Sequence, residues 1–393
     1  MQAVTRKGWP VQAPPRGRAA RSLPGTVRNT AMTGKLRTGR FFLPGPTEVH
    51  PDVLAAQIKP MIGHRGKAIQ DLMATVAEGL GPVFQTSRPV IVSASSATGL
   101  MEAAIRNGVG SGKVLALVNG AFSRRFAEIA RMCAKDVEIW EVPPGKVHSP
   151  EAVADRLEHG HFEALTLTHS ETSTGALQDL ESISAVVSGH PDTLLLVDSV
   201  TGIGGVEIYP DAWAVDFILT GSQKALALPP GLAFGVASEA MMERARSVPD
   251  RGWYFDLDRL ARNLESNQTP ATPAVSLLYA LEAQLERIHA EGMEARWKRH
   301  LAMLGRTVEW VTTLGDAGQP VSLLTAPGER SPTVTCVQVA RPLEVVAEAR
   351  ERGWVVGGGY GDLKDSTIRI GHMGDHTVEE LEALLEVLTG IIS

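Results

Sequence analysis

Short apolar segments alternate with amphipathic helical segments between about residues 51 and 240. We expect strands at residues 89–92, 114–118, 137–140, 164–168, 193–197, 216–219 and 232–236. Helical periodicity lies between most of these strands, for example at residues 122–132 and 150–158. Strands that are apolar on both faces and separated by helices form parallel sheets covered by helices. The pattern therefore predicts an α/β fold with a large, mostly parallel seven-stranded sheet.

A different pattern begins after this region. We expect a long helical stretch at residues 275–314, followed by a strand at 333–339, a helix at 342–352, strands at 354–356 and 367–370, and a helix at 378–392. Thr377 and Glu380 have the spacing of a capping box at the start of the last helix. A chain of 393 residues exceeds one ordinary core. We therefore expect a large domain at residues 41–290 and a smaller C-terminal α/β domain at 291–393.

The charge distribution divides the chain into a basic start and an acidic remainder. Residues 1–47 contain nine Lys or Arg and no Asp or Glu, although the net charge of the whole chain is −6. We interpret residues 1–40 as a disordered basic arm. Residues 1–31 are a transit peptide, a nucleic-acid-binding arm or, as we favour, translated sequence ahead of a start at Met32. The acidic body argues against nucleic acid as a partner, and no apolar run reaches the length of a membrane span.

The numbers and positions of the cysteines and histidines argue against a disulfide-rich protein and against a metal-binding protein. Cys133 and Cys336 are too few for a disulfide framework and lie in apolar surroundings, which fits a reducing cytoplasm. The eleven histidines are dispersed without metal-ligand spacing, so we expect no metal site. Among them we place only His372, three residues after Arg369, near the active site.

Lys224 and Asp198 are the most informative candidate residues. Lys224 follows the apolar segment 215–219, and Asp198 ends the apolar run 194–197. A buried lysine has an accessible neutral amine, which can form a Schiff base with an aldehyde cofactor. A carboxylate at the next strand end can keep the pyridinium nitrogen of pyridoxal phosphate protonated, so that the ring withdraws electrons. The alternative for Asp198 is a local cap of the following turn.

Three other strand ends carry small polar or aromatic residues. Residues 93–99 place serines and a threonine at a helix start, where backbone N–H groups can bind phosphate, although an ordinary N-cap explains them too. Phe122 can stack on a planar cofactor or pack as a hydrophobic staple. Thr172 lies in a hydroxyl-rich turn from which it can reach a ring substituent.

These segments give the chain a resemblance to class V aminotransferases of fold type I, in the alanine:glyoxylate and serine:glyoxylate (serine:pyruvate) group. The matching segments lie in order at residues 43–47, 61–65, 119–120, 171–175, 197–199, 221–226 and 368–374. They span nearly the whole chain after the basic arm. Departures are Phe122 where the family often has tryptophan, and Ala97 where many relatives have glycine.

The resemblance implies a role for each candidate residue. It implies Lys224 as the Schiff-base lysine and proton-transfer base, with Asp198 on the pyridine nitrogen. It implies pyridoxal 5′-phosphate held by Ser96, Ala97, Thr98 and Gln223 around the phosphate, Phe122 on the ring and Thr172 near the ring oxygen. It implies Arg369 on the substrate carboxylate, where a guanidinium offers a bidentate fork. It also implies a homodimer with shared active sites, in which Thr272, or alternatively Thr269, contacts the partner's phosphate.

The implied reaction is a ping-pong transfer of an amino group from alanine or serine to glyoxylate or pyruvate. An aminotransferase for 2-aminoethylphosphonate or ureidoglycine is the alternative within the same resemblance. A lyase or cysteine desulfurase needs a mobile, exposed cysteine, whereas Cys336 lies inside an expected strand. A non-catalytic protein on this fold would be expected to lack Lys224 or Asp198, and both are present.

Overall fold

The structure is a computed structural model that describes residues 40–393. The expectations about residues 1–39, including the basic arm and the start at Met32, lie outside the described residues. Within the described part, no helix combines the length and the apolar composition that crossing a membrane requires.

A seven-stranded sheet forms the larger part of the fold. Its strands are β2 (Val90–Ser93), β3 (Lys113–Val118), β4 (Asp136–Glu141), β5 (Ala164–Thr168), β8 (Leu194–Asp198), β9 (Phe217–Gly221) and β10 (Ala233–Ala237). They lie in the order β2-β10-β9-β8-β5-β3-β4. Only β10 runs antiparallel to its neighbours, and the four other pairings are parallel. The predicted seven-stranded, mostly parallel sheet is confirmed.

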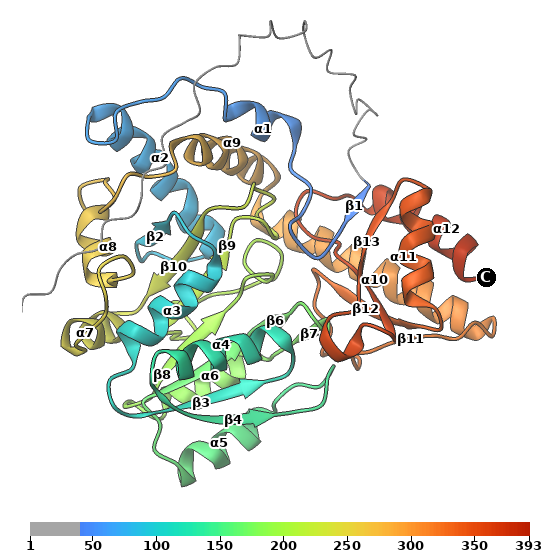
Figure 1. The fold of residues 1–393 in the computed structure, drawn as a ribbon, viewed down its shortest axis with the longest axis horizontal. Coiled ribbons are helices and arrows are strands. Elements are labelled where there is room, and N and C mark those ends of the chain that lie inside the picture. Colours follow the sequence, from blue (N-terminus) through green and yellow to red (C-terminus); the bar gives the residue numbers. More distant parts are fainter. Residues whose placement is uncertain (1–39) are drawn as a thin grey trace, which may run out of the picture. The chain divides into compact units, whose positions relative to one another are not determined.

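Helices cover both faces of this sheet, as Figure 1 shows. One hydrophobic cluster contains alternate strand residues such as Leu195 and Val197, and the other contains Leu194 and Leu196. Burial on both faces explains why these strands are apolar at every position. The first cluster includes residues of α2 (Lys67–Phe84), α5 (Pro150–His159), α6 (Leu180–Ser188) and α9 (Val275–Glu291); the second includes residues of α3 (Ala97–Gly108), α4 (Ala121–Met132), α7 (Glu239–Ser247) and α8 (Leu257–Leu264).

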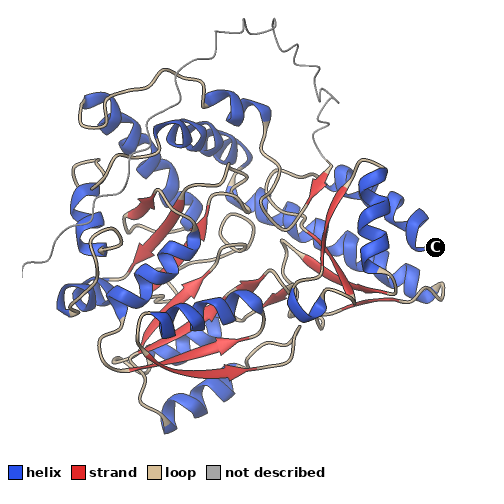
Figure 2. Cartoon of the chain, viewed as in Figure 1, coloured by secondary structure: helices blue, strands red, loops and turns tan. Residues whose placement is uncertain are grey.

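A five-stranded sheet with its own hydrophobic cluster forms the second part, and Figure 2 shows the helices packed against it. Its order is β1 (Phe41–Phe42), β13 (Val355–Gly358), β14 (Thr367–Ile370), β12 (Thr335–Val339) and β11 (Val321–Leu323). Its helices are α10 (Met293–Asp316), α11 (Pro342–Glu351) and α12 (Val378–Ile392). The capping box of α12 is confirmed, because the Glu380 N–H donates to Thr377 Oγ1 and the Thr377 N–H donates to the Glu380 carboxylate.

The expected helical stretch at residues 275–314 consists of two helices, α9 and α10. Gly292 separates the two helices with a φ of +80°, a conformation that glycine adopts without the steric cost of a Cβ atom. Strands β1 and β11 and helix α1 (Pro51–Ala56) were not predicted. The division into domains at residues 290 and 291 stays a proposal.

Candidate active site

The carboxyl ends of five strands, β2, β3, β5, β8 and β9, lie at the same edge of the large sheet. Four of these strands pair in parallel, and β2 has their direction because two antiparallel pairings, through β10, separate it from β9. Ligands bind beyond such strand ends in open α/β sheets. A cavity of about 200 Å³ lies there, and the predicted residues that line it are Ser96, Ala97, Thr98, Phe122, Thr172, Asp198, Gln223 and Lys224.

Lys224 is buried at the end of β9 and contacts the segment before α1. Its Nζ donates a hydrogen bond to the Pro44 carbonyl and lies 5.8 Å from the centre of the Phe122 ring. A Cβ atom on Gly45 would lie 2.4 Å from Nζ, so a larger residue would push the amine aside. Burial, together with the positive charge of Arg369, lowers the pKa of Lys224 to about 8. A useful fraction of the amine is therefore neutral near pH 8.

Asp198 is buried at the end of β8. Its Oδ1 accepts the Val200 N–H at 2.8 Å, and Thr168 Oγ1 lies 3.5 Å from Oδ2. Burial raises the pKa of Asp198 to about 7, and the charges of Glu171 and Lys224 act in opposite directions. A carboxylate this costly to ionise gains most from a cationic N–H group beside it, which a protonated pyridine nitrogen supplies.

Residues at the start of α3 could hold a phosphate group. Ser96 is the N-cap residue, but its side chain makes no capping hydrogen bond, which leaves N–H groups of the first turn available. Gln223 lines the same cavity, and the N–H₂ group of its side-chain amide can donate a hydrogen bond to an anion. Ala97 is the first residue of this helix. The free N–H groups at the start of α3 and the amide N–H₂ group of Gln223 therefore fit the phosphate group of pyridoxal phosphate.

Glu171, to which sequence reasoning assigned no role, fixes the position of Phe122. Its buried carboxylate accepts the backbone N–H groups of Phe122, Ser123 and Ser173 and the Ser173 hydroxyl. A carboxylate at a helix N-terminus is favoured by the free N–H groups and the helix dipole. A Cβ atom on Gly120 would lie 2.4 Å from Glu171 Cγ, so this close approach requires glycine. Only long-range contact brings Glu171 to α4, and therefore local sequence gave no signal for it.

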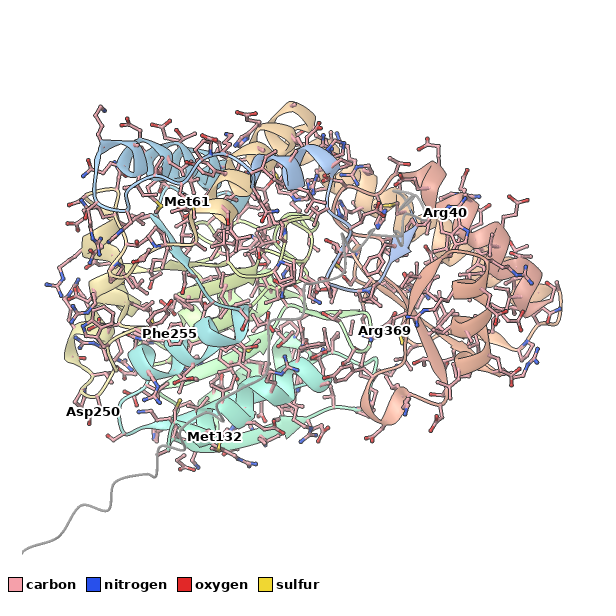
Figure 3. All side chains as sticks on the ribbon, turned by 45° about the horizontal axis from the view of Figure 1, so that its top comes forward. Arg40, Met61, Met132, Asp250, Phe255 and Arg369 are labelled. Atoms are coloured by element: carbon pink, nitrogen blue, oxygen red, sulfur yellow. The ribbon has the colours of Figure 1, made fainter. Side chains whose placement is uncertain are left out.

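Arg369 reaches the large sheet from β14, and Figure 3 shows it on the side of the second sheet that faces the first. Its Nε donates to the Gly358 carbonyl at 2.8 Å and its Nη1 donates to the Thr172 carbonyl at 3.2 Å. These bonds orient the guanidinium, and Nη2 donates no hydrogen bond to any residue from 40 to 393. Arg369 does not line the cavity itself, but its charge lowers the pKa of Lys224.

The structure places three other candidates outside the cavity. Thr269 and Thr272 line a separate pocket with Trp253 and Tyr254, so the predicted contact to a partner's phosphate stays a prediction. His372 is buried, with Nε2 2.7 Å from Thr335 Oγ1, and does not line the cavity. Sequence reasoning also missed Arg125, which does line it.

Known proteins share this fold and this order of segments. The family model for aminotransferase class V matches residues 50–345. The L-aspartate–glyoxylate aminotransferase of Paracoccus denitrificans is 33% identical over 86% of this chain and 87% of that protein. The serine–glyoxylate aminotransferase of Methylorubrum extorquens is 29% identical over 88% of this chain and 89% of that protein. The crystal structure of an alanine–glyoxylate aminotransferase from Nostoc sp. matches with a TM-score of 0.83 and 32% identity, over 94% of this chain and 100% of the other.

The fold and the edge cavity define an enzyme of the aminotransferase type. The chain belongs to the class V aminotransferase family. Enzymes of this family generally depend on pyridoxal phosphate, which agrees with the donor set around Lys224 and Asp198.

Proposed function

We propose that this enzyme moves the amino group of alanine or serine to glyoxylate or pyruvate, with pyridoxal 5′-phosphate as its cofactor. The observation that carries the proposal is the pair of buried groups Lys224 and Asp198 in one cavity at the carboxyl edge of the sheet. The three relatives named above are all glyoxylate aminotransferases, and their amino donors differ. That pattern favours glyoxylate as the acceptor and leaves the choice of amino donor open.

Each residue of the cavity has a task in this proposal. When bound, pyridoxal phosphate supplies an aldehyde that takes up the amino group and a ring that withdraws electrons from the substrate's α-carbon. The neutral Lys224 Nζ would accept the substrate's α-proton and then donate it to a different carbon, which is the net proton shift that transamination requires, and a pKa of about 8 suits both roles. Asp198 holds a proton on the ring nitrogen. The start of α3 and Gln223 bind the phosphate, and Phe122 and Thr172 orient the ring.

Arg369 is the proposed site for the substrate's α-carboxylate. Its Nη1 and Nε are held by two backbone carbonyls, so the group is oriented before substrate arrives. A carboxylate bound there would lie near Lys224, because the charge of Arg369 is close enough to lower the pKa of Lys224. The α-carboxylate is common to all amino acids, so Arg369 sets the class of reaction and leaves the choice of donor to other residues.

A lyase or desulfurase reaction that uses Cys336 receives no support. Cys336 is buried in β12, and burial raises the pKa of its thiol to about 11. It therefore lacks the thiolate character and the mobility that such a nucleophile needs. Ureidoglycine differs from alanine in the side group on its α-carbon, whereas 2-aminoethylphosphonate has no α-carboxylate and carries a phosphonate instead. The spectral experiment below separates the phosphonate directly.

The proposal extends to the assembly and the compartment. A homodimer would bring Thr272 or Thr269 of one subunit to the phosphate site of the other, and both threonines already lie together in one pocket. The segment that carries them is fixed by Arg65, whose guanidinium donates to the carbonyls of Thr269 and Pro270. Both cysteines are free thiols, which supports the cytoplasm as the compartment.

Absorption spectroscopy tests the proposal directly. We expect the purified protein, supplied with pyridoxal phosphate, to show a band at roughly 400–430 nm that alanine or serine removes. Glyoxylate or pyruvate should restore the band with release of the matching amino acid product. Loss of the band only with 2-aminoethylphosphonate would move the assignment to that alternative. Absence of any band after cofactor addition would refute the roles of Lys224 and Asp198.

A further inference from the structure

Arg125 is a second cation in the candidate active site. It lies on α4 one turn after Phe122 and lines the same cavity as Lys224. Its Cζ is 4.9 Å from the centre of the Phe122 ring, and its Nη2 donates to the Tyr360 hydroxyl at 3.4 Å. Arg125 has no ion pair with a carboxylate among residues 40–393, whereas its neighbour Arg124 pairs with Glu141. The partner of Arg125 is thus a neutral phenol at long hydrogen-bond distance.

Tyr360 connects Arg125 to Arg369. The Tyr360 ring centre lies 5.5 Å from the Phe122 ring centre and 5.5 Å from Arg369 Cζ. One tyrosine side chain therefore separates two guanidinium groups, and within the described part of the chain Arg369 also lacks a carboxylate partner. Tyr360 is 40% exposed and has Gly359 and Gly361 as its neighbours, the latter with a φ of +57°. Its side chain can consequently leave Arg125 without disturbing a packed core.

Two unpaired guanidinium groups beside a buried lysine repel each other and the lysine. The charges of Arg369 and Arg125 both lower the pKa of Lys224. One substrate carboxylate on Arg369 would relieve half of this excess charge. A second anionic group on the same substrate, one short side chain away, would relieve the other half at Arg125.

We propose that Arg125 is a specificity-determining residue that binds the side-chain carboxylate of an acidic amino donor, while Tyr360 holds Arg125 when the donor is small. This inference rests on the proposed function and widens its donor class from alanine and serine to a dicarboxylic amino acid such as aspartate. The distal carboxylate displaces the Tyr360 hydroxyl from Arg125 and forms a charge-assisted pair. A guanidinium is suited to this exchange because it stays charged and can donate hydrogen bonds to either partner without losing its ring contact to Phe122.

The test compares kcat/KM for aspartate and asparagine, which have nearly the same shape and differ in side-chain charge. We expect the native enzyme to prefer aspartate, and Arg125→Gln to lower the aspartate to asparagine ratio by about ten- to a hundredfold. Arg125→Lys should keep part of the preference. Arg131→Gln removes an equal charge from the exposed end of the same helix and should leave the ratio as in the native enzyme.

Tyr360→Phe supplies a second, independent variant. It removes the hydroxyl that competes for Arg125 and keeps the ring between Phe122 and Arg369. We expect kcat/KM for aspartate to rise a few-fold, with a smaller change for alanine. If kcat/KM falls for both donors by the same factor, the hydroxyl only supports the fold of the loop. That result would overturn the proposal that the hydroxyl competes with the donor's carboxylate for Arg125.

The results for the inference and for the proposed function are distinguishable. Turnover of alanine or serine without turnover of aspartate would overturn the role of Arg125 and leave the proposed function intact. An aspartate to asparagine ratio that is the same in Arg125→Gln and Arg131→Gln would also overturn it. Turnover of none of these donors by the cofactor-loaded enzyme would refute the proposed function and the inference together.

Discussion

Asp198→Asn is expected to stabilise the cofactor-free protein at alkaline pH. In the folded protein burial raises the pKa of Asp198 to about 7, from an ordinary value of 3.8. Between these two values the folded carboxyl keeps a proton that the unfolded chain releases. The free energy of unfolding contributed by this group is therefore fully present below about pH 4 and is lost as the pH rises through about 7. Asparagine does not titrate, so the variant does not lose this contribution to the free energy of unfolding as the pH rises.

The size of the effect follows from the two pKa values. At about 1.4 kcal/mol per pH unit, the interval from 3.8 to about 7 corresponds to roughly 4 kcal/mol. The variant also removes a negative charge that favours protonated Lys224, and this works in the opposite direction. We therefore expect the stability of the variant relative to the native protein to increase by about 2–4 kcal/mol between pH 4.5 and pH 8.

Urea denaturation of both apoproteins at several pH values measures this difference. Asp192→Asn is the matched control, because Asp192 is exposed. Parallel stability curves for Asp198→Asn and the native protein would refute the reasoning, since they would mean that the carboxyl titrates alike in the folded and unfolded chains. The same variant should bind pyridoxal phosphate more weakly, because an amide cannot neutralise a protonated ring nitrogen.

Three further predictions concern single side chains. Lys224→Ala should lose the visible absorption band and essentially all turnover, and retained turnover would contradict its assignment. Arg369→Ala should raise KM for every amino donor by about ten- to a hundredfold, as loss of a charge-assisted pair does, and steady-state kinetics with alanine would show it. Glu171→Gln should cost about 2–3 kcal/mol in urea denaturation, because a buried carboxylate that accepts three backbone N–H groups becomes partly a donor. Glu128→Gln, at an exposed position of α4, the helix that Glu171 contacts, is its control and should change stability by less than about 0.5 kcal/mol.

The sequence predicted the large sheet well for a physical reason. Strands buried on both faces must be apolar throughout, and the helices between them show a separate periodicity. The short strands β1 and β11 carry little such pattern, because β1 has two residues and β11 is not fully buried. The break at Gly292 falls between two helices with continuous apolar periodicity, and a single glycine did not reveal it.

Site residues at strand ends were predictable, whereas those brought in from other parts of the chain were not. Lys224, Asp198 and Phe122 each follow a recognisable strand, and one edge of a parallel sheet brings them together. Glu171 acts on α4 from 49 residues away, and Tyr360 meets Arg125 across 235 residues. Neither partner has a local pattern that differs from an ordinary turn or surface residue. Their roles depend on long-range packing, which spacing alone does not reveal.

The position of Lys224 depends on a buried ion network that no motif marks. Arg296, which is 1% exposed, donates through Nη2 to the carbonyl of Ala225, next to Lys224, and through Nε to the Gly204 carbonyl. Its guanidinium is in turn paired with Asp375 at 3.0 Å and Glu291 at 2.8 Å. Breaking such a buried pair by removing one partner is costly, because the other charge stays buried. Helix α10 thus fixes the backbone beside the lysine, and the large sheet alone does not hold the amine in place.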